Sequence, residues 1–357
     1  YILSHYKIDF SGDFDTRSPE GLIPLPKSRD GQSPYENQYY LCALVPPMAV
    51  QTKRHYKANG KLLLTGEYLV LNGAVSLALP CKLGQSMNVS ERPGSEIVWK
   101  SYDRKGNLWF SGSFDLMAFD PIDSTDKDIA NSIQQLLRAA CRQNSEFLSQ
   151  WRKYMVETYL EFDRDWGLGS SSTLVWCVAQ WAEVNPYILL FDTFGGSGYD
   201  IACADADGPV LYQFLEDELH IDGADFDPSF KKQLFLVYLG RKQNSREALK
   251  KYHQSKAGLN GSVDKVSRLT ESINTATSLK EFESLVRQHE SLVSDILGLP
   301  TVQSKEFPDY WGAVKSLGAW GGDFVLATSD RDEEETRSYF KSKGMEVIFR
   351  YDELILS

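Results

Sequence analysis

The chain has 357 residues, of which 38 are basic and 49 acidic, so its formal net charge at pH 7 is −11. This acidic excess excludes nucleic acid or an anionic membrane as a partner of the whole chain, because such polyanions select basic surfaces. Hydrophobic residues make up 42% and charged residues 24%, as in ordinary globular proteins, and the length predicts about two domains.

Residues 1–52 differ in character from the rest of the chain. Six prolines lie there among glycine, serine and acidic residues, with little hydrophobic periodicity. This composition predicts an irregular N-terminal extension, and a small β-rich subdomain built on Tyr35, Tyr39 and Tyr40 is the alternative. No chemistry is assigned to this segment.

From residue 53 the pattern becomes regular. Residues 61–71 are an apolar, β-rich run closed by the turn signal Asn72-Gly73, and four short strand-like segments follow at 75–79, 86–89, 96–99 and 108–111. Residues 126–147 carry apolar side chains at helical spacing, which predicts an amphipathic helix. Residues 154–162 return to a strand pattern.

Two glycine-rich segments come next. Gly167-Leu-Gly-Ser-Ser-Ser-Thr173 runs directly into a predicted helix that ends near Ala182, and Gly195-Gly-Ser-Gly-Tyr-Asp200 precedes a predicted strand at 210–214. The acidic stretch 216–227 has the composition of a domain linker. We therefore expect an N-terminal domain over residues 53–222 and a C-terminal domain over residues 223–357.

The C-terminal part alternates strands and helices. The predicted elements are a strand at 234–239, helices at 245–258, 263–277 and 279–297, a helix just before Gly318-Ala-Trp-Gly-Gly322, a strand at 324–327, a helix at 333–343 and a strand at 346–349. This order predicts an α+β domain.

The segment Gly167–Thr173 has the composition of a phosphate-binding loop. Its glycines let the backbone approach a ligand, and serines at a helix start either cap free N–H groups or bind phosphate oxygens. The helix dipole favours an anion at the same place. The segment is not a Walker A loop, because no Gly-Lys-Ser/Thr follows, and it lacks the third glycine of the dinucleotide pattern. An ordinary capping turn is the alternative.

Three other segments carry candidate chemistry. Asp200 either caps a short element or takes a proton from a substrate hydroxyl beside a glycine-lined pocket. Lys61 is either an edge residue with a solvated ammonium or a cation that stabilises an ionised carboxylate and the transferring oxygens. The glycines of segment 318–322 either make a tight turn or pack backbone beside the phosphate loop.

Each signal is weak alone, but their order and spacing are specific. Lys61 with Gly66-Glu67-Tyr68, then Gly167-Leu-Gly-Ser-Ser-Ser172, then Gly196-Ser-Gly-Tyr-Asp200 and finally Gly318-Ala-Trp-Gly-Gly322 resemble the motifs of the GHMP kinase family, which includes galactokinase, homoserine kinase, mevalonate kinase and phosphomevalonate kinase. The resemblance covers about residues 56–349. It implies an α+β, two-domain GHMP kinase fold, with an N-terminal ribosomal-protein-S5-domain-2-like α/β domain and a C-terminal ferredoxin-like α+β domain.

The resemblance also implies roles for individual residues. Asp200 would be the general base, and Lys61 would lie near it and near the transferred phosphoryl group. The loop would hold the ATP phosphates, and the third motif would support the loop and the substrate pocket. The residues assigned in this way are Gly167, Leu168, Gly169, Ser170, Ser171, Ser172 and Thr173 in the loop, and Gly318, Gly321 and Gly322 in the third motif.

The resemblance further implies a Mg²⁺ ion bound with ATP. Ser171 would contact this ion or a phosphate oxygen. Mevalonate kinases usually carry a Mg²⁺-binding glutamate between the second motif and the catalytic aspartate. The corresponding acids here are Glu183 and Asp192, and the sequence leaves the choice between them open.

The first motif and the segment ending in Asp200-Ile-Ala202 look most like phosphomevalonate kinases, and next like mevalonate kinases. Glu67, Tyr68 and Ser197 are accordingly expected near the substrate. Arg241 and Lys242 are either part of a solvated helix start or a clamp for a substrate carboxylate or phosphate.

The expected reaction is therefore ATP- and Mg²⁺-dependent phosphorylation of mevalonate or 5-phosphomevalonate, in isoprenoid precursor synthesis. Alternatives within the family are a diphosphomevalonate decarboxylase and another small-molecule kinase such as homoserine kinase. An alternative of a different class is a catalytically degenerate, nucleotide-binding regulator.

The remaining features concern location and partners. The five cysteines are scattered and form no CxxC pair, which favours a reducing, cytoplasmic setting over a disulfide framework or zinc ribbon. No charged and then apolar leader is seen at the N-terminal end, and no apolar run reaches the roughly 20 residues of a membrane span. We expect a small anionic substrate, no membrane or nucleic-acid partner, and a monomer or homodimer.

Overall fold

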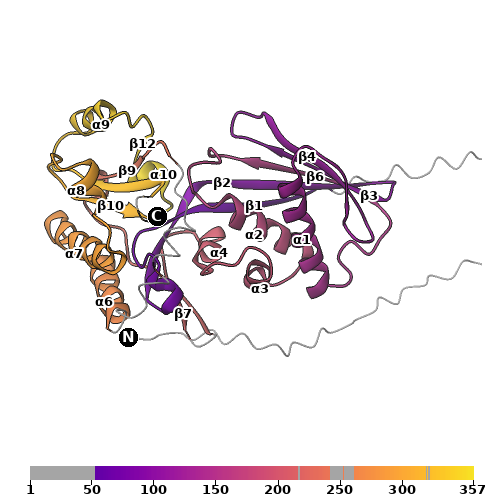
Figure 1. Cartoon of the computed structure of the whole chain (residues 1–357), viewed down its shortest axis with the longest axis horizontal. Coiled ribbons are helices and arrows are strands. Elements are labelled where there is room, and N and C mark those ends of the chain that lie inside the picture. Colours follow the sequence, from indigo (N-terminus) through magenta and orange to yellow (C-terminus); the bar gives the residue numbers. More distant parts are fainter. Residues whose placement is uncertain (1–52, 216–217, 242–251, 253–260, 319, 321) are drawn as a thin grey trace, which may run out of the picture. The chain divides into compact units, whose positions relative to one another are not determined.

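The structure is a computed structural model that describes residues 53–357, except 216–217, 242–251, 253–260, 319 and 321 (Figure 1). The chain divides into two units after Val50, and all of the described residues belong to the second unit, Gln51–Ser357. The expected N-terminal extension, all but Tyr252 of the predicted helix at 245–258, Lys242 and Gly321 lie outside the described residues.

The first part of the unit contains an eight-stranded sheet. Seven strands follow the order β5-β4-β3-β6-β2-β7-β8, and β1 pairs with β2 off this path. Neighbouring strands are antiparallel except β3 and β6, which are parallel. The strands are β1 (Lys53–Leu63), β2 (Ser76–Arg92), β3 (Glu96–Tyr102), β4 (Leu108–Asp115), β5 (Pro121–Ser124), β6 (Lys153–Leu160), β7 (Val210–Leu215) and β8 (Glu218–Gly223).

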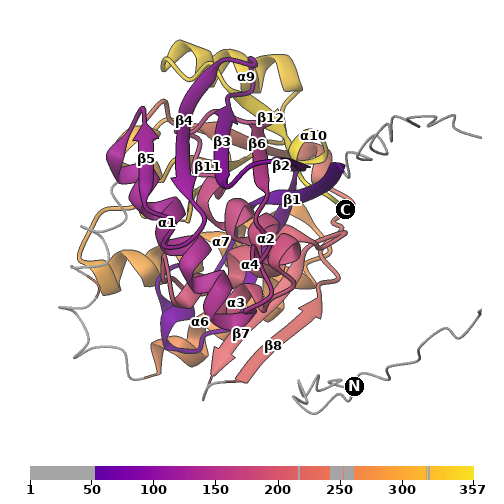
Figure 2. The ribbon, with the colours of Figure 1, turned by 90° about the vertical axis from the view of Figure 1, so that its right-hand side faces the viewer.

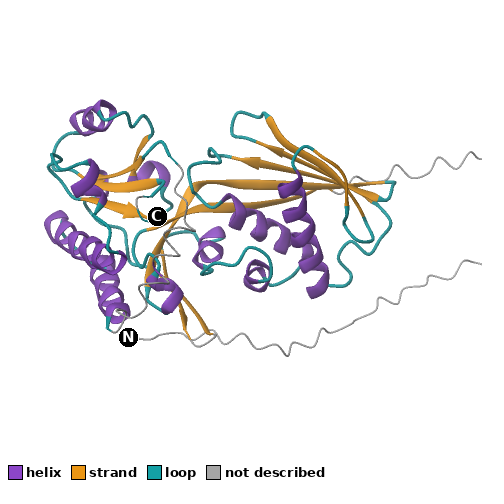
Figure 3. Cartoon of the chain, in the orientation of Figure 1, coloured by secondary structure: helices purple, strands orange, loops and turns teal. Residues whose placement is uncertain are grey.

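Helices cover one face of this sheet (Figure 3). They are α1 (Lys127–Gln143), α2 (Ser170–Ala182), α3 (Pro186–Phe191) and α4 (Tyr199–Ala204). Burial alternates residue by residue along β3 and β6, as expected for strands with one face on a core. Helix α1 begins where Asp126 accepts hydrogen bonds from the N–H groups of Asp128 and Ile129. The apolar sides of α1 and α2 share one core cluster with β2 and β3.

The second part contains a four-stranded antiparallel sheet in the order β10-β11-β9-β12. Its strands are β9 (Leu234–Tyr238), β10 (Val314–Leu317), β11 (Phe324–Thr328) and β12 (Ile348–Arg350). Leu234 and Leu236 of β9 pack in the core cluster that contains Phe282 of α7, whereas Phe235 and Val237 pack in the cluster that contains Phe340 of α9. Helices therefore cover both faces of this sheet, and β9 is apolar throughout (Figure 1).

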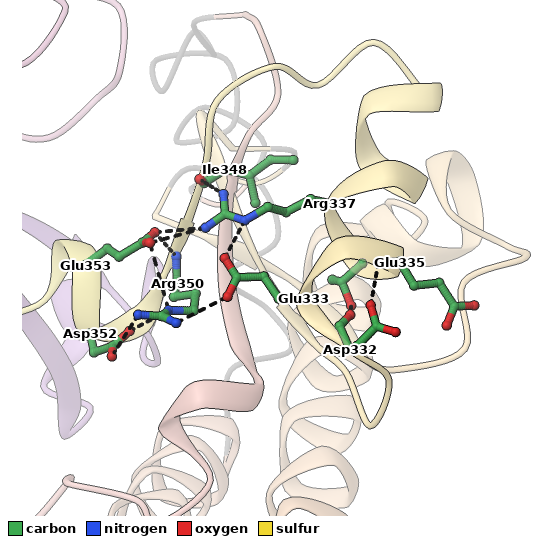
Figure 4. A network of polar contacts seen from close by, with 9 residues as sticks. Asp332, Glu333, Glu335, Arg337, Ile348, Arg350, Asp352 and Glu353 are labelled. Atoms are coloured by element: carbon green, nitrogen blue, oxygen red, sulfur yellow. Dashed lines mark hydrogen bonds and ion pairs between the residues drawn. The ribbon is translucent and has the colours of Figure 1, made fainter.

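The helices of this part are α6 (Ser262–Asn274), α7 (Leu279–Leu297), α8 (Val302–Glu306), α9 (Glu333–Ser342) and α10 (Tyr351–Leu354). A half-buried polar network joins α9 to β12 and α10 (Figure 4). Arg337 donates to the Ile348 carbonyl over 2.6 Å and pairs with Glu333 and Glu353. Arg350 pairs with Glu333 as well. These contacts hold the last helix against the small sheet.

The α+β class expected from the sequence is confirmed, and the helix predicted at 279–297 is found as α7. Three local predictions were wrong. The predicted strand at 61–71 ends at Leu63, and residues 69–72 form a short 3₁₀ helix, η1 (Leu69–Asn72). Gly66 causes the change of direction, since its φ is +89° and a Cβ there would overlap the Ser76 hydroxyl.

The second wrong prediction is the acidic linker. Residues 218–223 of that stretch form β8, which makes a hairpin with β7 (Figure 2). The third is the helix expected just before Gly318. Residues 314–317 are instead strand β10, which pairs with β11 and is buried throughout. No helix within the described part of the chain is long and apolar enough to cross a membrane.

Candidate active site

The glycine- and serine-rich loop forms a tight turn that leads into α2. Gly167 and Gly169 have φ values of +68° and +90°, and Gly169 is the residue that precedes the first helical turn. A Cβ on Gly167 would overlap the Asp323 carboxylate. Backbone of this kind lies close to its neighbours and presents N–H groups outward, as a phosphate-binding loop does.

The hydroxyl groups of the loop divide into two sets. Ser172 and Thr173 are buried, and both donate back to the Gly169 carbonyl, over 2.9 Å and 3.0 Å. Ser170 and Ser171 are more exposed, and together with Ser172 they line a cavity beside the loop backbone. Ser172 and Thr173 therefore stabilise the turn, and Ser170 and Ser171 have hydroxyls left for a ligand.

This cavity has a volume of about 290 Å³ and is built from segments far apart in the chain. Its walls come from the end of β1, the loop at 164–172, the turn after α3, the start of α4 and the turn between β10 and β11. The lining residues at the last of these are Leu317, Gly318, Asp323 and Phe324. The cavity therefore lies between the two sheets.

Lys61 and Asp200 meet at this cavity. Lys61 Nζ lies 3.1 Å from Asp200 Oδ1 and donates to the Tyr199 hydroxyl, also over 3.1 Å. The Lys61 backbone N–H donates to the Leu168 carbonyl of the loop. Burial alone lowers the pKa of Lys61, but the Asp200 carboxylate and the Tyr199 phenol raise this pKa above its ordinary value. Lys61 is therefore positively charged beside the loop.

Glu67, expected near the substrate, lies elsewhere. Its side chain is fully buried and paired with Lys315 of β10, while the neighbouring Gly66 N–H donates to His289 Nε2 over 3.1 Å. Burial raises the pKa of Glu67 to about 7 although Lys315 opposes this shift. Burial, together with Lys315, lowers the pKa of His289 well below its ordinary value. The sequence analysis did not identify this buried cluster, which also includes Glu290 of α7.

The other expected substrate residues do not line the cavity either. The Tyr68 hydroxyl accepts from the Trp320 backbone N–H over 2.6 Å, and the Ser197 carbonyl accepts from the Tyr212 hydroxyl. Arg241 is paired with Glu306 of α8. These contacts anchor backbone segments near the cavity, and the side chains of Glu67 and Tyr68 stay inside the protein.

The structure separates the two metal candidates from the cavity. Glu183 is the C-cap of α2 and Asp192 the C-cap of α3, where Asp192 lies 3.9 Å from Arg142. Neither is a lining residue. In the described ranges, no group of three His, Cys, Asp or Glu side chains is arranged to hold a metal ion.

The donor chemistry of the cavity nevertheless fits Mg²⁺. This ion is bound in kinases through one or two carboxylates and substrate phosphates, and it keeps several waters. Asp200, Asp323 and the hydroxyl of Ser171 are hard oxygen donors that line the cavity.

Sequence reasoning missed Asp323 and also Arg164, which both lie just outside the recognised motifs. Of the third motif, Gly318 lines the cavity and Gly322 is buried.

Replacing Gly167 with alanine tests the loop. The new methyl group would overlap the Asp323 carboxylate, and the left-handed φ would strain the backbone. We expect nucleotide affinity to fall by roughly tenfold or more, because the loop must shift from its position. Calorimetric titration with a non-hydrolysable ATP analogue measures this loss. Gly106→Ala, at an exposed turn with open space around it, is the control, and equal losses in both variants would contradict the prediction.

The sequence of this chain matches no protein-family model and no curated protein. Among solved structures, the protein Lin0012 of Listeria innocua is 16% identical, with a TM-score of 0.65 over 83% of this chain and 99% of that one. L. major mevalonate kinase, solved with R-mevalonate, is 15% identical, with a TM-score of 0.61 over 85% of this chain and 97% of that one.

Streptococcus pneumoniae phosphomevalonate kinase, solved with phosphomevalonate and AMPPNP, is 18% identical, with a TM-score of 0.61 over 83% of this chain and 99% of that one. At this level of identity the likeness concerns the fold. The chain has the two-domain α+β fold of these mevalonate and phosphomevalonate kinases, as the resemblance of its motifs to the GHMP kinases predicted.

Proposed function

We propose that this protein is an ATP- and Mg²⁺-dependent small-molecule kinase of the GHMP type. The proposal rests on the position of Lys61 and Asp200. The Lys61 Nζ and Asp200 Oδ1 atoms lie 3.1 Å apart, in the same cavity as the Gly167–Ser172 loop. Phosphoryl transfer requires chiefly the positioning of two substrates and the neutralisation of charge, and this small set of groups supplies both.

In the proposed mechanism, Asp200 accepts the proton of the acceptor hydroxyl as that oxygen attacks the γ-phosphorus of ATP. Lys61 keeps Asp200 ionised before the transfer and stabilises negative charge on the transferring oxygens. The N–H groups at the start of α2 and the hydroxyls of Ser170 and Ser171 hold the phosphate oxygens. When bound, Mg²⁺ would be held by Ser171 and Asp323 and would neutralise part of the charge of the triphosphate.

We propose mevalonate or 5-phosphomevalonate as the acceptor. The first and second motifs support this choice, and so does the similarity in fold to kinases whose solved structures hold mevalonate and phosphomevalonate. In this proposal residues 53–222 form the domain that binds ATP, and residues 223–357 form the domain that completes the cavity through Gly318 and Asp323. Leu190, Phe194 and Gly195 lie on the Asp200 side, where the carbon chain of an acceptor would pack.

ADP release in the presence of MgATP tests the proposal. We expect turnover with mevalonate or 5-phosphomevalonate and little with homoserine or galactose. Diphosphomevalonate is included because release of carbon dioxide together with ADP would identify a decarboxylase instead. ATP binding without ADP release from any acceptor would indicate a nucleotide-binding regulator and would overturn the kinase proposal.

A further inference from the structure

Arg164 has a different environment from the other cations near the cavity. It lines the cavity three residues before Gly167, and its guanidinium lies 3.9 Å from the centroid of the Trp109 ring. No ion pair joins it to any carboxylate among the described residues, whereas Lys61 is paired with Asp200 and the nearby Arg104 with Asp163. Arg164 is thus a positioned and exposed cation that faces the cavity.

The charge in the cavity indicates what Arg164 binds. Among the described residues, the cavity is lined by the cations Lys61 and Arg164 and by the carboxylates Asp200 and Asp323. A nucleoside triphosphate remains anionic even when one Mg²⁺ is bound, so it requires a cation that no protein carboxylate already neutralises. Guanidinium groups match phosphate geometry and keep their charge at all physiological pH values.

The order of groups along the loop indicates which end of the nucleotide is involved. Lys61 contacts Leu168 through its backbone, and its side chain lies beside Gly169, so the Lys61–Asp200 pair is near the start of α2. Arg164 precedes the opposite end of the loop. A triphosphate along the loop with its γ-phosphate toward Asp200 therefore has its nucleoside end toward Arg164.

We infer that Arg164, held against Trp109, is a nucleotide-binding residue that contacts the α- or β-phosphate of the bound nucleotide. This inference rests on the proposed function and adds a specificity residue to it. The Trp109 ring restricts the orientation of the guanidinium, so less conformational entropy is lost when the phosphate binds. The acceptor binds at the other end of the cavity and does not need this group.

Direct binding measurements on the full chain test the inference. Arg164→Ala is expected to weaken binding of MgAMPPNP roughly tenfold to hundredfold, as for a lost charge-assisted hydrogen bond. MgADP should lose the same factor, because the contact is to phosphates that both nucleotides carry. The KM for the acceptor should stay near the wild-type value. Arg104→Ala is the matched control, since it removes a neighbouring cation that does not line the cavity.

Three results would overturn the inference. Unchanged nucleotide affinity together with a raised acceptor KM would assign Arg164 to the acceptor. A loss confined to MgAMPPNP would place the contact at the γ-phosphate. An equal loss of nucleotide affinity in Arg104→Ala would show that the effect comes from positive charge near the cavity in general and not from a contact made by Arg164. Arg164→Gln keeps a planar group over Trp109 and allows the same titrations if the alanine variant is unstable. The binding measurements do not depend on turnover. Failure of the kinase proposal would appear as no ADP release by the wild type, and it can therefore be distinguished from failure of the Arg164 inference.

Discussion

Asp200→Asn is expected to lower kcat by roughly 10²- to 10⁴-fold while the affinity for nucleotide stays near that of the wild type. Asparagine keeps the size of the side chain but cannot accept the proton of the acceptor hydroxyl. In the proposed mechanism, Lys61 and the loop at 167–173 hold the phosphates independently of that proton transfer. Steady-state ADP release gives kcat, and titration with MgAMPPNP gives the affinity.

Asp205→Asn is the control for this experiment. Asp205 is the exposed C-cap residue of the same helix, α4, and it does not line the cavity. We expect near-normal turnover from this variant. Near-normal turnover from Asp200→Asn as well would show that Asp200 is not the general base, and the proposed mechanism would have to be abandoned.

Lys315→Met is expected to destabilise the protein by about 3–5 kcal/mol, although Lys315 touches no substrate. The lysine is fully buried between Glu67 and Glu290, so its loss leaves buried carboxylates without a cation. The cluster joins the segment after β1 to β10, and the ends of β1 and β10 both line the cavity. Urea denaturation of the full chain measures this loss, and we expect a lower midpoint of unfolding for Lys315→Met than for the wild type.

Two further variants define the cause. In the double variant Glu67→Gln with Lys315→Met, part of the lost stability should return, because one uncompensated carboxylate is removed. Lys343→Met removes the surface pair with Asp309 and should cost about 0–1 kcal/mol. A loss in Lys315→Met no larger than that of Lys343→Met would contradict a stabilising role for the buried pair.

The same cluster predicts a dependence of stability on pH. The pKa of Glu67 is about 7 in the folded protein, above the ordinary value of 4.5. The folded state therefore binds more protons than the unfolded state between these values, and this carboxyl contributes stability that is lost as the pH rises from 4.5 to 7. The lowered pKa of His289 acts in the opposite direction, with stability lost as the pH falls below 6.5. Comparing the free energy of unfolding of Glu67→Gln with that of the wild type from pH 5 to 8 isolates the effect of Glu67.

The sequence predicted the parts of the site that local patterns define. Two glycines, a run of serines and a following helical pattern made the Gly167–Thr173 loop and α2 recognisable. The spacing of motifs placed Lys61 and Asp200 in the same site, and the structure finds their side chains 3.1 Å apart. The roles of these residues in catalysis stay predictions until the variants are measured.

Other expected site residues pair with distant partners away from the cavity. Glu67 belongs to a recognised motif, yet its carboxylate pairs with Lys315, a residue 248 positions away in the chain. Arg241 had the composition of an anion clamp, yet it pairs with Glu306. Neither partner lies within the short range over which periodicity and turn preferences act.

The sequence by itself thus determined the α+β class, the glycine- and serine-rich turn at Gly167–Thr173 and most of the helices, because hydrophobic periodicity and turn preferences are local properties. Only the tertiary structure decided which charged side chains reach the cavity. Strand pairing and the contact between the two sheets bring Asp323 to the loop and Trp109 to Arg164, and they bury Glu67 with Lys315. Burial and proximity across hundreds of residues decide whether a charge serves binding or stability, and no local pattern records them.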